Sequence, residues 1–155
     1  MASNLLRGGC ACGSVRYEIR ARAPRMFCCH CRACQRQSGG PMLMLLATKP
    51  GELAVVSGKI AAYHSVSIGT RHFCSICGSP IYLSRVGNPG AISVFAGTLD
   101  HPEAFKPAFH AFAGDKASWL QLEPGAKLFA RQAVEPAGRQ AKSHGGKRSI
   151  SIERK

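Results

Sequence analysis

Cys74-Ser75-Ile76-Cys77-Gly78 is the stretch of this sequence that most constrains its fold. Two residues between the cysteines allow a tight turn that directs both sulfurs at one metal ion, and the glycine that follows relieves the turn. The best partners for this pair are Cys10 and Cys12, because the neighbouring glycines give their backbone the freedom to bring both sulfurs round. These four cysteines predict a closed tetrahedral zinc site, the form typical of structural zinc.

The cellular compartment decides whether eight cysteines indicate metal sites or disulfides. Residues 1–9 offer only Leu5 and Leu6 before Arg7, so they lack the apolar segment of a secretory signal. No apolar run approaches the roughly 20 residues of a membrane-spanning helix. We therefore expect a cytoplasmic protein with reduced thiols and no membrane partner, in which the cysteines bind metal.

A second cysteine cluster lies in the segment Cys28-Cys29-His30-Cys31-Arg32-Ala33-Cys34. Thiolates from Cys29, Cys31 and Cys34 would leave one tetrahedral position open, as catalytic zinc sites do. If Cys28 or His30 filled that position, the cluster would be a second structural zinc site with no position left for a substrate. We expect Cys28 to be a small buried side chain. His30 is expected either to act as an acid or base beside the metal or to bond the backbone.

Alternating polar and apolar residues predict a mainly β protein built of antiparallel sheets. Val15, Tyr17 and Ile19 alternate with polar neighbours, the period of a half-buried strand. Further short strand-like runs, separated by Gly, Pro and Ser, cover residues 42–47, 53–56, 60–66, 71–73, 81–84 and 91–95. Single helical turns are expected at 31–37 and 101–105.

The apolar pattern fades near residue 131, which predicts one zinc-binding domain over residues 1–130 and a flexible basic tail over 131–155. The chain carries 21 Lys and Arg against 8 Asp and Glu, a formal charge of +13. Such a surface suits anionic small molecules, nucleic acid or acidic membranes, and charge alone does not choose among them. The sequence does not indicate an oligomeric state.

Three cysteine motifs in one order resemble a known family. They are Gly9-Cys10-Ala11-Cys12-Gly13, then Cys29-His30-Cys31 with Cys34, then Phe73-Cys74 with Cys77-Gly78. The order is similar to that of the glutathione-dependent formaldehyde-activating enzymes, a family that includes the centromere protein V proteins. The segment Gly97-Thr98-Leu99-Asp100, with His110, Lys116 and Trp119, resembles the family's closing part. Cys28 and the long basic tail depart from the family pattern.

The resemblance implies a zinc-stabilised β-tent fold with two zinc ions. Cys10, Cys12, Cys74 and Cys77 would hold a structural zinc, and Cys29, Cys31 and Cys34 a catalytic one. It also implies a carbon–sulfur lyase of the S-(hydroxymethyl)glutathione synthase type, acting on the adduct of glutathione, or another small thiol, with formaldehyde or another small aldehyde. The alternative is a non-catalytic zinc-stabilised binding module whose basic tail contacts nucleic acid or another polyanion.

Glutathione carries two carboxylates, so its binding would need basic side chains near the second cluster. The candidates are Arg32, Arg36, Arg71 and Lys116, although any one of them is more often ordinary surface charge. Trp119, the one tryptophan, is more often a core residue than a substrate contact.

Overall fold

The computed structural model describes residues 4–49, 51–66 and 69–132. The strands are β1 (Asn4–Gly9), β2 (Arg16–Ala21), β3 (Arg25–Cys29), β4 (Leu43–Thr48), β5 (Leu53–Ser57), β6 (Ile60–Ser65), β7 (Gly69–Cys74), β8 (Pro80–Arg85), β9 (Asn88–Phe95) and β10 (His110–Ala111). The helices are α1 (Arg32–Ser38) and the 3-10 turns η1 (Ala96–Thr98), η2 (Pro102–Ala104) and η3 (Ala113–Asp115). The longest of these helices, α1, has seven residues, far short of a membrane span.

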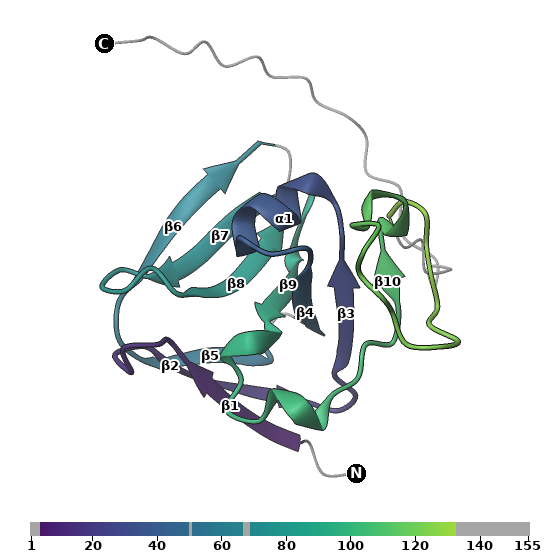
Figure 1. The fold of residues 1–155 in the computed structure, drawn as a ribbon. Helices are drawn as coiled ribbons and strands as arrows, with labels where there is room; N and C mark the ends of the chain where they lie inside the picture. Colours follow the sequence, from purple (N-terminus) through teal and green to yellow (C-terminus); the bar gives the residue numbers. More distant parts are fainter. Residues whose placement is uncertain (1–3, 50, 67–68, 133–155) are drawn as a thin grey trace, which may run out of the picture.

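The strands form two sheets, which confirms the prediction of a mainly β protein with antiparallel sheets. The small sheet has the order β1-β2-β5, and the large sheet has the order β10-β3-β4-β9-β8-β7-β6. In Figure 1 the small sheet lies at the bottom of the view, and β10 lies at the right-hand side of the large sheet. Paired strands are antiparallel, except that β10 runs parallel to β3. The more specific β-tent description stays a prediction.

Most predicted elements are present, and three strands were not predicted. The six strand-like runs correspond to β4 through β9, and the helical turns correspond to α1 and η2. The unpredicted strands are β1, β3 and β10. β1 ends in two glycines, which are poor strand formers, and β10 has only two residues. β3 lacks alternation because its last four residues, through Cys29, are all buried.

One core lies between the two sheets. Its central side chains come from both sheets and include Tyr17, Ile19, Met26, Leu46, Ile81 and Val94. Cys10 and Cys74 belong to the same cluster, so the first cysteine pair and the knuckle meet at the edge of this core. Burial of apolar surface therefore brings the predicted ligands together across the chain.

A second apolar cluster covers the other face of the large sheet. It contains Phe27 and Cys29 from β3, Leu45 from β4 and Leu83 from β8, with Phe109 packed over them. β3 and β4 are thus buried on both faces, as strands in the middle of a protein are. The three cysteines of the second cluster belong to this face.

The chain crosses from the small sheet to the large one between β5 and β6, at Gly58. This corner contacts both cysteine loops of the first site. The Ser57 hydroxyl donates to the Ser14 carbonyl at 3.2 Å, and the Ser75 amide donates to the Lys59 carbonyl at 3.1 Å. Gly58 has φ +83°, and a Cβ at this position would lie 2.4 Å from the Ser14 carbonyl oxygen.

The predicted domain boundary at residue 130 and the predicted basic tail lie at the end of the described residues or beyond it. Residues 133–155, which make up most of the predicted basic tail, lie outside the described residues. Arg131, where the tail was predicted to begin, accepts a hydrogen bond from the Phe112 amide through its carbonyl at 2.9 Å. The domain boundary and the role of the tail stay predictions.

The corner at Gly58 leads to a stability prediction. Gly58→Ala should lower the free energy of unfolding by about 2–4 kcal/mol, because positive φ and backbone overlap act together. Gly51→Ala is the matched control: φ is +80°, but nothing lies within 4 Å of the added Cβ. Gly51→Ala should lower the free energy of unfolding by only about 1 kcal/mol. Equal denaturation midpoints for the two variants would show that the close approach at Gly58 is unimportant.

Candidate metal centres and the cavity beside one of them

The first cysteine cluster unites two pairs that are far apart in the sequence. The sulfurs of Cys10, Cys12, Cys74 and Cys77 all lie within 4.8 Å of one another. The Cys10 and Cys12 sulfurs are 3.4 Å apart, and those of Cys12 and Cys74 are 3.9 Å apart. Zinc–sulfur bonds of ~2.3 Å give a tetrahedron with sulfur–sulfur edges of about 3.8 Å. The four sulfurs therefore fit a closed tetrahedral zinc site.

Hydrogen bonds around this cluster favour thiolates, which are the form that binds metal. The amide of Val15 donates to the Cys10 sulfur at 3.2 Å, and the amide of Ile76 donates to the Cys74 sulfur at 3.4 Å. The Ser79 hydroxyl, 3.2 Å from the Cys77 sulfur, lowers the pKa of Cys77 to about 5. At neutral pH Cys77 is thus in the thiolate form that binds a cation.

The second cluster is built where β3 ends and α1 begins. Cys29 is the last residue of β3, Cys31 is the N-cap of α1, and Cys34 lies in the helix. Their sulfurs also lie within 4.8 Å of one another, with 3.6 Å between Cys29 and Cys31. Within the described ranges, no fourth His, Cys, Asp or Glu atom joins them. Three sulfurs at tetrahedral spacing fit a zinc site with one position left for water or a ligand.

The environment of this cluster favours one thiolate in particular. A hydrogen bond from the Cys34 thiol lowers the pKa of Cys29 to about 6, and the charge of Arg85 acts in the same direction. The pKa of Cys34 is raised correspondingly by its bond to Cys29. The Cys31 sulfur accepts from the Cys34 amide at 3.4 Å, so it caps the helix as well.

Cys28 is not part of the cluster. Successive residues of a strand point to opposite faces, so Cys28 faces away from Cys29. It is fully buried, and burial raises the pKa of its thiol to about 11. The expectation of a small buried side chain is confirmed.

The Nε2 atom of His30 pairs with another histidine, while its Nδ1 atom is buried with no hydrogen-bond partner among the described residues. Its Nε2 lies 2.9 Å from Nδ1 of His110, and Nε2 of His110 lies 3.3 Å from a carboxylate oxygen of Glu123. Both rings are buried and stacked, with centroids 5.2 Å apart. Neither sequence-based alternative for the ring included this pairing, because it depends on the parallel contact of β10 with β3.

Gln35 holds the cysteine loop in place from the other side. Its side-chain amide donates to the carbonyl of His30 at 2.6 Å and to the carbonyl of Asp115 at 3.0 Å. The loop is therefore tied to the segment near η3. Each of the three sulfurs is positioned by a strand, a helix or these bonds.

A cavity of about 720 Å³ opens beside the second cluster, and Cys29, Cys31 and Cys34 line it. Most of its other walls are apolar, including Phe27, Leu45, Leu83, Ile92, Phe109 and Phe112. The first cluster contributes nothing to this lining. The two clusters thus differ in coordination: the first offers four sulfurs, two of them on the exposed residues Cys12 and Cys77, and the second offers three and faces a space of ligand size.

The basic residues of this cavity are not the predicted ones. Arg32, Arg36, Arg71 and Lys116 are absent from its lining, and Lys116 donates to the carbonyls of Ala117 and Leu120. The charged residues in the lining are Arg25 and Arg85. Arg25 lies four residues before Cys29, so recognising β3 would have placed both side chains on one face. Arg85 comes from β8, and no local signal connects it to the cysteines.

The predicted closing segment packs on the fold, but Trp119 does not enter a core. The Thr98 hydroxyl lies 2.8 Å from the Tyr17 hydroxyl, and the Asp100 carboxylate accepts two hydrogen bonds from the Arg16 guanidinium. Trp119 is 69% exposed, so its assignment as a core residue is wrong. Trp119 lies in a turn, outside both apolar clusters.

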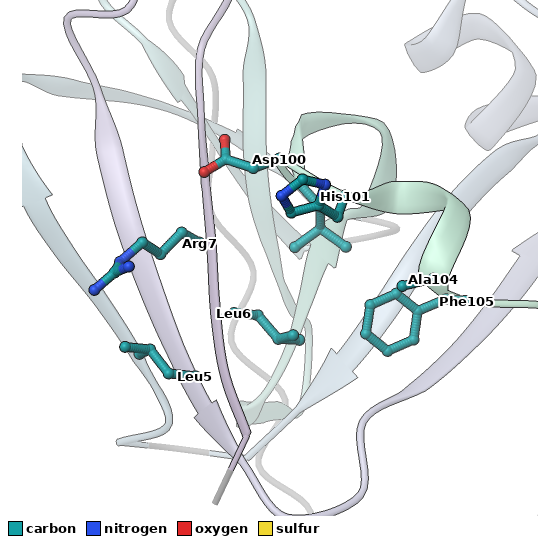
Figure 2. A pocket seen from close by; sticks show the side chains of 8 residues that line it. Leu5, Leu6, Arg7, Asp100, His101, Ala104 and Phe105 are labelled. Atoms are coloured by element: carbon teal, nitrogen blue, oxygen red, sulfur yellow. The ribbon is translucent and has the colours of Figure 1, made fainter.

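A smaller hollow of about 220 Å³ lies between β1 and the segment that follows β9. Figure 2 shows its lining, which contains Leu6, Phe105 and His101 but none of the clustered cysteines. Its one acidic residue, Asp100, is paired with Arg16. This hollow brings together no chemical group comparable to the cysteine cluster.

Comparisons with known proteins agree with this geometry. The model of the glutathione-dependent formaldehyde-activating enzyme family matches residues 5–115. A Halomonas elongata protein, provisionally named as such an enzyme, is 29% identical over 130 residues, covering 77% of this chain and 82% of that protein. An uncharacterized lyase of Schizosaccharomyces pombe is 26% identical over 77 residues, covering 50% of this chain and 56% of the lyase.

Among solved structures, a Rhodobacter sphaeroides protein superposes with a TM-score of 0.51 at 25% identity. The match covers 61% of this chain and 87% of that one. The family model spans well over half of the sequence and includes all seven clustered cysteines. The chain therefore belongs to the glutathione-dependent formaldehyde-activating enzyme family.

Proposed function

We propose that this protein is a zinc-dependent carbon–sulfur lyase/synthase that acts on the adduct of a thiol, such as glutathione, with a small aldehyde, such as formaldehyde. The observation that carries the proposal is the three-sulfur cluster of Cys29, Cys31 and Cys34, which opens into the cavity. In the synthase direction the thiol sulfur bonds to the aldehyde carbon, the carbonyl double bond becomes a single bond, and the thiol proton ends on the oxygen. The lyase direction reverses these changes.

Two zinc ions per chain are part of the proposal. Cys10, Cys12, Cys74 and Cys77 would hold one as a structural ion, and Cys29, Cys31 and Cys34 would hold the other. The sulfur spacings fit both assignments. Zinc bound in the open site would supply a Lewis acid and would favour the thiolate form of an incoming thiol.

The residues of the chain contribute binding, orientation and shelter from water. The three cysteines are held in position by β3, by α1 and by the bonds of Gln35. The apolar walls limit the water around the reacting groups, and a cationic rim offsets the charge of an anionic thiol. Holding thiol and aldehyde side by side replaces a chance encounter by a prearranged one.

The names of the relatives support an enzyme and agree with lyase chemistry. The family description names glutathione and formaldehyde, and the S. pombe relative is named a lyase. The competing binding-module hypothesis depends on the basic tail, and residues 133–155 lie outside the described residues. No contact in the described part favours nucleic acid over a small ligand.

The closed and open sites lead to different predictions for single cysteine variants. Purified protein should hold two zinc ions per chain, and a chelator should remove one of them much faster. Cys74→Ser should prevent folding, because the binding energy of a structural zinc, ~10 kcal/mol, matches the stability of a small domain. Cys31→Ser should keep most of the stability, since serine is also a good N-cap.

Metal analysis and thermal melts of both variants measure this difference. Cys31→Ser should bind one zinc and melt within a few degrees of the wild type. If both variants lose folded protein to the same extent, the assignment of one structural and one open site is incorrect.

Cobalt substitution tests whether a thiol reaches the open site. The visible spectrum of protein with cobalt in that site should change when glutathione is added, because another sulfur donor alters the ligand field. The sulfur-saturated first site should not respond. Cys29→Ser and Cys34→Ser should each remove both the spectral change and any acceleration of adduct exchange measured by NMR.

Ser38→Ala is the matched control for the cobalt experiment. Ser38 is the last residue of α1, is exposed and does not line the cavity. The spectrum of the cobalt-loaded Ser38→Ala variant should therefore match that of the wild type. A wild-type spectrum that ignores glutathione and other thiols, together with an exchange rate equal to that of buffer, would rule out the proposed activity.

A further inference from the structure

The cavity beside the second cluster has its floor on one face of the large sheet. In β3 the residues on this face are Arg25, Phe27 and Cys29, at the strand period of two. The register pairs Arg25 with Ala47 and Phe27 with Leu45. Ala47 in turn pairs with Ser93, and Ser93 pairs with Leu83. All of these residues line the cavity, so the sheet register determines its layout.

This layout places the backbone of Arg25 and Arg85 toward one end of the floor and Cys29 toward the other, while the guanidinium of Arg85 reaches back to the ring of Phe27. Arg25 is four residues from Cys29 along β3, and strands rise ~3.3 Å per residue, so the two Cα atoms are about 13 Å apart. Arg85 lies two residues beyond Leu83 on β8, on the same side as Arg25. A molecule that contacts both the sulfurs and the Arg85 guanidinium must therefore reach across Phe27, which formaldehyde alone cannot do.

Aromatic rings support both guanidinium groups. The rings of Phe27 and Phe109 stack with centroids 5.1 Å apart and an interplanar angle of 9°. The guanidinium carbon of Arg85 lies 5.9 Å from the Phe27 centroid, and that of Arg25 lies 5.9 Å from the Phe109 centroid. At Arg85 the ring engages the flat face of the guanidinium, and the edge of a guanidinium is the part suited to a carboxylate.

The rest of the described lining determines which anions fit. It contains no acidic side chain, so nothing in it opposes a carboxylate or attracts an ammonium group. Apart from the cysteines and the arginines the walls are mainly aliphatic and aromatic, with Thr48, Ser93 and Gln132 as polar exceptions. The Thr48 hydroxyl already donates to the Ile92 carbonyl at 3.3 Å. An apolar ligand body would bury surface here, whereas amide groups would lose hydrogen bonds to water.

We infer that this cavity binds a thiol with an apolar body and a distal carboxylate, its sulfur at Cys29, Cys31 and Cys34 and its carboxylate at Arg85, with Arg25 adding positive charge to the same end. The inference rests on the proposed function, because it takes the cysteine cluster as the place where the thiol sulfur binds. It differs from that proposal in substrate class. Glutathione has the carboxylates but also carries an ammonium group and two amides, for which the described walls provide few partners.

The test compares 4-(mercaptomethyl)benzoate with its neutral analogue 4-(mercaptomethyl)benzamide and with glutathione. Dissociation constants are measured by calorimetry on zinc-loaded protein and by the visible spectrum of cobalt-loaded protein. The benzoate should bind about tenfold more tightly than the benzamide, because a charged hydrogen bond is replaced by a neutral one. It should also bind more tightly than glutathione.

Variants then locate the carboxylate. Arg85→Gln should weaken the benzoate about tenfold and leave the benzamide within about twofold, since only the charged contact is lost. Arg25→Gln should weaken the benzoate less, because Arg25 adds charge to this end without being the direct partner. Arg22→Gln is the matched control, because Arg22 is exposed, is close in sequence to Arg25 and does not line the cavity. It should change neither constant.

The possible failures are distinguishable. If the benzoate and the benzamide bind the wild type equally, the arginine site is wrong, and the proposed lyase activity is unaffected. If glutathione binds more tightly than the benzoate, the apolar substrate class is wrong. If none of the three thiols changes the cobalt spectrum, the proposed function fails and the inference fails with it. The wild-type comparison decides the matter even if an arginine variant does not fold.

Discussion

The meeting of Cys10 and Cys12 with Cys74 and Cys77 is the constraint on which the remaining structure depends. Sixty-two residues separate Cys12 from Cys74, yet their sulfurs lie 3.9 Å apart. The contact joins the loop before β2, in the small sheet, to the end of β7, in the large one. With Gly58 at the same corner, it determines where the two sheets meet and closes one edge of the core between them.

That junction leaves the opposite face of the large sheet available for a ligand site. On β3 the odd-numbered residues Phe27 and Cys29 face the cavity, while Met26 and Cys28 face the protein. The two adjacent cysteines consequently differ in chemistry. Burial raises the pKa of Cys28 to about 11, while bonds within the cluster lower the pKa of Cys29 to about 6. A strand buried on both faces thus supplies structure on one side and reactive sulfur on the other.

The second site is also held by groups that do not touch it. The buried pair of His30 and His110 joins the loop after β3 to β10, and Gln35 ties the same loop to Asp115. Residues well over seventy positions apart in the sequence therefore position one short cysteine loop. The family match includes these partners, since it continues to residue 115, beyond the last cysteine.

How far the sequence could predict this protein depends on whether a feature is local. The knuckle at Cys74, the spacing of Cys29, Cys31 and Cys34, and the alternation in β2 are short-range patterns, so ligand groups and most strands followed from them. β3 was missed because burial on both faces removes alternation, and Trp119 was misplaced because composition says nothing about which surface is covered.

The sequence by itself determined which cysteines form each cluster, since chelate spacing is a property of a few consecutive residues. Only the tertiary structure decided that Arg25 and Arg85 share a cavity with the open cluster, because strand pairing across four strands brings together residues that no local pattern connects.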